Sequence, residues 1–110
     1  MGTFASIYVE MNKNEFDEKY IQKLPDGWAV RIACLSWTTA KGDVTPVMFR
    51  CMGADQSEIS IRDIMVRKVD KRPNGYRYNE YVCEASVNGV LRPFRLRHTP
   101  VENEWLLILR

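Results

Sequence analysis

Apolar and polar residues alternate on both sides of an Asn-Gly dipeptide in the C-terminal half of the chain. The flanking runs are YVCEASV, residues 81–87, and VLRPFRL, residues 90–96. Asn-Gly between two such runs is typical of a two-residue hairpin with a type I′ turn, in which both turn residues have positive φ. The pattern therefore predicts a hairpin with Asn88 and Gly89 at its turn and Val87 opposite Val90.

The register of this hairpin gathers its apolar side chains on one face. That face consists of Tyr81, Cys83, Ala85, Phe94 and Leu96, with Arg92 opposite Ala85. The other face pairs Glu80 with Arg97, Val82 with Arg95 and Glu84 with Pro93, and brings Arg95 diagonally near Glu84. Opposite charges across strands contribute roughly 0.2–1 kcal/mol each. We expect this second face to be solvated and held by charge pairs.

A second hairpin is predicted nearer the N-terminus, where the strand-like segments 28–39 and 44–52 flank KGD at 41–43. A Gly42-Asp43 turn of type II′ would place Trp37 opposite Met48 and Cys34 opposite Cys51. One face is then a core face, made of Val30, Ile32, Cys34, Val47, Phe49 and Cys51. The other carries Arg31, Leu35, Trp37, Met48 and Arg50.

One N-terminal segment has helical rather than strand periodicity. Asn12 and Glu15 resemble a capping box, with Asn in place of the usual Ser or Thr. Phe16, Tyr20 and Leu24 then recur every four residues, and PDG at 25–27 is a stop signal. The spacing predicts a helix over about 14–24.

The remaining apolar runs favour strands. Residues 4–11 are rich in β-branched and aromatic types, and the last run, EWLLILR at 104–110, is apolar on both faces, as in a central strand. Residues 57–70 fit a helix or strands, and their many β-branched residues favour strands. RPNG at 72–75 predicts a turn. We therefore expect an α+β fold: a single domain over 1–110, with one N-terminal helix packed on a curved, largely antiparallel sheet of about six to seven strands.

Composition and short sequence patterns indicate in which compartment the protein resides. No run is apolar for 18 residues, and no secretory signal pattern is present, so a membrane span and export are not predicted. Three cysteines without a CxxC spacing argue against a disulfide framework or a zinc site, and favour the reducing cytoplasm. The opening MGTFAS fits the pattern for myristoylation at Gly2, but a glycine after Met is common and Phe4 to Val9 are better explained as the start of the first strand.

Few residues suggest catalysis. His98 is the only histidine, so no histidine cluster can hold a metal, and the hairpin register places it opposite Asn79. Cys83 points into the predicted core, where cysteine usually acts as a small hydrophobe. Carboxylates are scattered, and no glycine-rich phosphate loop occurs. We expect no catalytic site, no cofactor and no metal.

Two surfaces are candidates for binding. Arg31, Leu35, Trp37, Met48 and Arg50 combine residue types enriched at protein interfaces, unless the helix or a second sheet covers them. They predict a small stand-alone binding protein that acts by contact with another protein, of the inhibitor, immunity or phage anti-defence type.

The second surface is basic and aromatic. Residues 59–110 hold ten Lys and Arg against six Asp and Glu, although the whole chain has a net charge of only +2. A surface formed by Arg72, Tyr76, Tyr78, Arg95 and Arg97 would suit stacked bases and phosphates, so a single-stranded nucleic-acid module is the alternative. No RNP1 pattern accompanies it.

Overall fold

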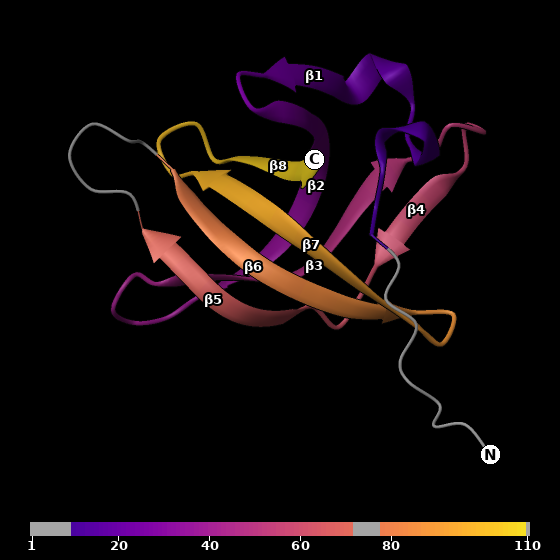
Figure 1. Cartoon of the computed structure of the whole chain (residues 1–110). Helices are drawn as coiled ribbons and strands as arrows, with labels where there is room; N and C mark the ends of the chain where they lie inside the picture. Colours follow the sequence, from indigo (N-terminus) through magenta and orange to yellow (C-terminus); the bar gives the residue numbers. More distant parts are fainter. Residues whose placement is uncertain (1–9, 72–77, 110) are drawn as a thin grey trace.

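The computed structural model describes residues 10–71 and 78–109 (Figure 1). These residues form two 3₁₀ turns and eight strands, and every strand pair is antiparallel. The elements are η1 (Lys13–Glu15), η2 (Glu18–Tyr20), β1 (Ile21–Leu24), β2 (Gly27–Thr38), β3 (Val44–Met52), β4 (Glu58–Ile61), β5 (Met65–Lys71), β6 (Asn79–Val87), β7 (Val90–Thr99) and β8 (Glu104–Leu109). Among these residues no helix is long and apolar enough to cross a membrane.

One strongly curved sheet contains all eight strands, in the order β4-β3-β2-β8-β7-β6-β5, with β1 paired to β2 (Figure 1). The long strand β2 connects its two parts. Residues 28–32 of β2 pair with β8, whereas residues 33–38 pair with β3. The β2–β3 hairpin therefore continues away from β8. Its tip reaches β5 and β6, where the Tyr81 hydroxyl donates to the Val44 carbonyl (2.7 Å) and Lys71 pairs with Asp43 (3.0 Å).

The curvature encloses one apolar core. Its buried members are Met11, Phe16, Val30, Phe49, Cys51, Ile61, Tyr81, Cys83, Ala85, Phe94, Leu96, Trp105, Leu107 and Leu109. Phe49 of β3 meets Phe94 of β7 edge to face, with ring centroids 5.5 Å apart, so the two parts of the sheet pack directly. On the opposite face of β8, Leu106 and Ile108 are buried in a smaller cluster with Leu24 and Ala29. Burial on both faces confirms that 104–109 is a central strand.

The expected α+β fold is wrong, because the predicted helix over 14–24 does not form. The capping box is present: the Asn14 N–H donates to Asn12 Oδ1 (3.0 Å) and the Asn12 N–H donates to Glu15 Oε2 (2.9 Å). It closes only the 3₁₀ turn η1. The chain is extended at Phe16, and a second short turn, η2, leads into β1.

Tertiary hydrogen bonds explain this difference. The Asp17 N–H donates to the Met52 carbonyl (3.0 Å), and the Glu15 carbonyl accepts from Ala54 (2.9 Å). Both groups would otherwise take part in helical bonds. Glu15 also binds Arg92 of β7 through two contacts of 2.7 and 2.8 Å, which fixes η1 against the sheet. An isolated helix of about ten residues is marginal in water, so these partners decide the conformation.

The predicted register of the β2–β3 hairpin is also wrong. Thr38 pairs with Val44, and residues 39–43 form the loop, closed by hydrogen bonds between Thr39 and Asp43. A bulge between Leu35 and Ser36 shifts the pairing again, so that Cys34 lies opposite Phe49 rather than Cys51. The bulge turns Val47 outward, where it is 40% exposed instead of buried.

The C-terminal hairpin has the turn and the register that its sequence predicted. Asn88 and Gly89 have φ of 52° and 77°, and every predicted pair from Val87–Val90 to Asn79–His98 is present. Residues 57–70 contain β4 and β5, which confirms the preference for strands. The predicted strand over 4–11 lies mostly outside the described residues, and Gly2 and the turn at 72–75 lie wholly outside them.

Candidate functional site

The five residues predicted to form a protein-binding face lie on the side of β2 and β3 opposite the core. We call Arg31, Leu35, Trp37, Met48 and Arg50 the β2–β3 surface. Leu35 is 60% exposed and Trp37 is 69% exposed, whereas Met48 is half-buried. Leu35 and Met48 are direct cross-strand partners, and Trp37 lies opposite Thr45. Neither of the coverings that the sequence left open, a helix or a second sheet, packs over this surface among the described residues.

A depression begins where β2 and β3 separate. Their pairing ends at Ala33 and Arg50, because β2 continues beside β8 and β3 beside β4. The resulting splay pocket has a volume of about 520 Å³. It is lined by Tyr20, Arg31, Ile32, Ala33, Arg50, Cys51, Met52 and Glu58.

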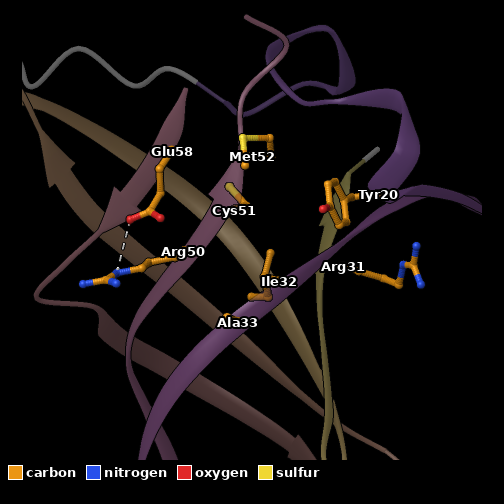
Figure 2. A pocket seen from close by; sticks show the side chains of 8 residues that line it. All are labelled: Tyr20, Arg31, Ile32, Ala33, Arg50, Cys51, Met52 and Glu58. Atoms are coloured by element: carbon orange, nitrogen blue, oxygen red, sulfur yellow. Dashed lines mark ion pairs between the residues drawn. The ribbon is translucent and has the colours of Figure 1, made fainter. Parts of the chain in front are cut away.

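The splay pocket has an apolar middle and charged sides. Figure 2 shows Ile32, Cys51 and Met52 between two rims, with Tyr20 and Arg31 on one side. The other rim carries Arg50 and Glu58, whose side chains form an ion pair at 3.6 Å. Such an arrangement suits a ligand with an apolar part and a charged part.

A second hollow of about 330 Å³ adjoins the first. It is lined by Ala33, Cys34, Leu35, Met48, Phe49 and Arg50, so it shares Ala33 and Arg50 with the splay pocket. Together the two hollows lead from Arg31 to Leu35. The recessed area of the β2–β3 surface is thus continuous with its exposed apolar side chains.

The Arg31 guanidinium is bound by a backbone carbonyl and lies near an aromatic ring. Its Nη2 donates to the Lys19 carbonyl at 3.2 Å, and the group lies 5.8 Å from the centre of the Tyr20 ring. No carboxylate among the described residues forms an ion pair with it. Tyr20 reaches this site because 18–24 forms η2 and β1 rather than a helix.

Cys51, at the middle of the splay pocket, is a neutral thiol at physiological pH. Burial raises the pKa of Cys51 to about 12, and the nearby Glu15 charge acts in the same direction. Burial likewise raises the pKa of Cys34 and of Cys83 to about 12. Nucleophilic cysteines need a lowered pKa, so the pocket is suited to binding rather than to thiolate chemistry.

The described arginines of the alternative basic surface form ion pairs within this chain. Glu80 is buried and pairs with Arg95 at 3.2 Å and with Arg97 at 3.5 Å. The Arg97 guanidinium lies 4.1 Å from the centre of the Tyr78 ring. Arg72 and Tyr76 lie outside the described residues.

The predicted pairing of Glu80 with Arg97 is present. Arg95 also pairs with Glu80, and Glu84 pairs with Arg67 of β5, which was not predicted. Both carboxylates are buried, so the face is not the solvated one expected from the hairpin alone. The reason is that β5 pairs with β6 and supplies a cation that the hairpin sequence did not reveal.

His98 belongs to the packing of β7 and β8. It is buried, its ring stacks on Trp105 with centroids 4.2 Å apart, and Nε2 lies 3.0 Å from Asn103 Oδ1. Within the described ranges, no three His, Cys, Asp or Glu side chains gather as metal ligands.

Sequence reasoning missed Tyr20, Met52 and Glu58 as parts of the site. The predicted helix contains Tyr20, and the wrong hairpin register hides the point at which β2 and β3 separate. The alternation of 28–37 already placed Arg31, Leu35 and Trp37 on one face. Comparisons of this chain with protein-family models, with curated proteins and with solved structures found no match. The functional argument therefore rests on the surface itself.

Proposed function

We propose that this protein binds another protein through the β2–β3 surface and acts by contact rather than by turnover, as inhibitor and immunity proteins do. The observation that carries the proposal is the exposure of Leu35 and Trp37 beside a recessed area. Exposed large side chains are common singly, but here they adjoin Met48 and two arginines. That combination is typical of interface hot spots.

The hollow next to the exposed side chains supports the same proposal. Hot-spot residues usually fill pockets on the partner and face pockets of their own. Trp37 projects from β2, whereas the hollow beside Leu35 and Met48 can receive a partner side chain. A partner can thus bury the exposed apolar area while leaving the core of this chain unchanged.

Charge pairing makes nucleic acid the weaker candidate. Arg95 and Arg97 already pair with buried Glu80, so phosphate binding would have to break those contacts. Breaking a buried charge pair is costly, because it leaves a buried carboxylate uncompensated. The proposal also assigns the protein to the reducing cytoplasm, in keeping with three free cysteines.

The test starts from a partner captured on immobilised wild-type protein, then identified and purified. We expect Trp37→Ala to weaken its binding by at least about 2 kcal/mol, or roughly thirtyfold in Kd. Val101→Ala, which changes another exposed apolar side chain in the loop between β7 and β8, is the matched control. Equal Kd values for Trp37→Ala and wild type would contradict the proposal.

A second experiment tests the alternative function, the binding of single-stranded nucleic acid. Single-stranded oligonucleotides of random sequence are titrated against the protein at several salt concentrations. Binding through phosphates would weaken steeply with salt, because counterions are released when phosphates are neutralised. We expect no such binding, and a steep salt dependence would favour the basic surface instead.

A further inference from the structure

We infer that the partner of the β2–β3 surface presents an acidic side chain next to a large apolar one, with the carboxylate bound by Arg31. The inference rests on the proposed function and adds the chemistry of the partner. It is carried by the lack of an ion pair between Arg31 and the described residues, by the position of Arg31 in the lining of the splay pocket, and by the apolar middle of that pocket.

Arg31 differs from most arginines of the described chain. Arg50, Arg67, Arg92, Arg95 and Arg97 each form an ion pair with a carboxylate of this chain. Arg31 and Arg62 form none with the described residues. Of these two, Arg31 lines the splay pocket. Figure 2 shows its side chain at the Tyr20 rim and directed away from the apolar middle, so it can meet the part of a ligand that extends beyond that rim.

The guanidinium is also oriented in advance. Its hydrogen bond to the Lys19 carbonyl uses Nη2, so donors on the remaining nitrogens are left for a ligand. The centre of the Tyr20 ring lies 5.8 Å from the guanidinium. Arginine donors match the two oxygens of a carboxylate, and a partly fixed side chain loses less entropy on binding.

The apolar middle of the splay pocket favours an apolar side chain next to the partner's carboxylate. Ile32, Cys51 and Met52 provide apolar surface between the rims, as Figure 2 shows, and Cys51 carries no charge at neutral pH. An apolar side chain next to the acidic one would bury that surface.

The opposite rim can adapt to the ligand. The Arg50–Glu58 pair spans 3.6 Å, and both side chains are more than half exposed. Such surface pairs contribute little stability, so Arg50 can leave Glu58 for a second partner carboxylate at small cost. The pocket is thus lined by one cation without an ion pair to the described residues and by one that is weakly paired.

Peptide display tests the inference even before a partner is identified. The full-length wild-type protein is immobilised, and a phage library of random twelve-residue peptides is selected on it. Peptides that survive are synthesised, and their Kd is measured for wild type, Arg31→Glu and Arg62→Glu.

Arg62→Glu is the matched control, because it reverses the charge of the other arginine without a described carboxylate partner. Thermal melts check that each variant is folded, and Arg31→Gln replaces Arg31→Glu if the latter is not.

We expect the selected peptides to share an Asp or Glu beside a large apolar residue. Their Kd should rise on the order of tenfold or more with Arg31→Glu, and Arg62→Glu should have little effect. Changing the acidic residue of the peptide to its amide should weaken binding to wild type but not to Arg31→Glu. That non-additivity would assign the carboxylate to Arg31.

Two results overturn the inference in distinguishable ways. Peptides that bind Arg31→Glu as well as wild type but lose binding with Trp37→Ala contradict the acidic anchor and leave the proposed function standing. A selection that yields no peptide sensitive to either Arg31→Glu or Trp37→Ala contradicts both.

Discussion

Trp28 and Trp37 lie near opposite ends of β2 and have different environments. Trp37 is exposed on the β2–β3 surface. Trp28 is half-buried against the core, and the ammonium groups of Lys13 and Lys23 lie 4.1 and 4.5 Å from the centre of its ring. The alternation of β2 alone suggested a buried Trp28, but the ring is shared between the core and two surface lysines.

This contrast predicts different effects on stability. We expect Trp37→Ala to change the melting temperature little, because an exposed side chain contributes little to the monomer. Trp28→Ala removes core packing and two cation–π contacts, so it should lower the free energy of unfolding by about 2–4 kcal/mol. Thermal and urea melts of both variants provide the measurement. If Trp37→Ala melts as far below wild type as Trp28→Ala, the β2–β3 surface is covered in the folded protein.

At the scale of elements, the two long hairpins differ in how their turns are specified. The β6–β7 turn follows its dipeptide, because Asn and Gly tolerate positive φ at lower cost than other residues. The β2–β3 turn does not follow Gly42-Asp43, because Thr39 forms hydrogen bonds across a longer loop. A bulge then compensates for the change in register.

Gly89 allows the β6–β7 turn to be tested. Its φ is 77°, and a Cβ added there would meet no heavy atom within 4 Å. Gly89→Val should therefore destabilise the protein through backbone strain alone, by about 1–2 kcal/mol. Gly89→Asn is the control and should cost less, since Asn adopts positive φ more readily. Urea melts compare the three proteins, and equal stability of Gly89→Val and wild type would refute the turn assignment.

At the scale of the whole molecule, the enclosed core determines the ionisation of the cysteines. Cys34, Cys51 and Cys83 share this interior, and burial raises the pKa of each from 9.0 to about 12. In the unfolded chain the thiols ionise near pH 9, whereas in the folded chain they stay protonated until about pH 12. The unfolded state therefore binds fewer protons in this window, and stability falls as pH rises from about 9 to about 12.

Urea melts between about pH 8 and pH 10 measure this effect before most tyrosines ionise. The free energy of unfolding should fall over this range, and Cys83→Ala should show a shallower fall even though its stability at neutral pH is lower. Native thiols should also react slowly with a thiolate-specific reagent, and quickly after unfolding in urea. A native protein that reacts as fast as the unfolded one would show that the thiols are not enclosed.

Several features of this protein could be predicted from local patterns. The Asn88-Gly89 hairpin and its full register followed from a turn type that the backbone accepts at low cost. The strands within 57–70 followed from β-branched residues, and the central position of 104–109 from apolar side chains on both faces. Simple alternation placed Arg31, Leu35 and Trp37 on one face, although it left open whether that face is covered. Each of these depends on neighbours in the chain or across one hairpin.

Other features depended on groups far away in the sequence. The capping box at Asn12 formed, but the backbone of Glu15 and Asp17 found partners in residues 52–54, so two 3₁₀ turns and a short strand replaced the helix. The splay pocket exists because β2 has two different neighbours, β8 and β3, along its length. The sequence by itself determined which side chains prefer burial and which turns are tight. Only the tertiary structure decided which backbone groups pair, because short helices and hairpin registers differ by free energies that a few distant hydrogen bonds can reverse.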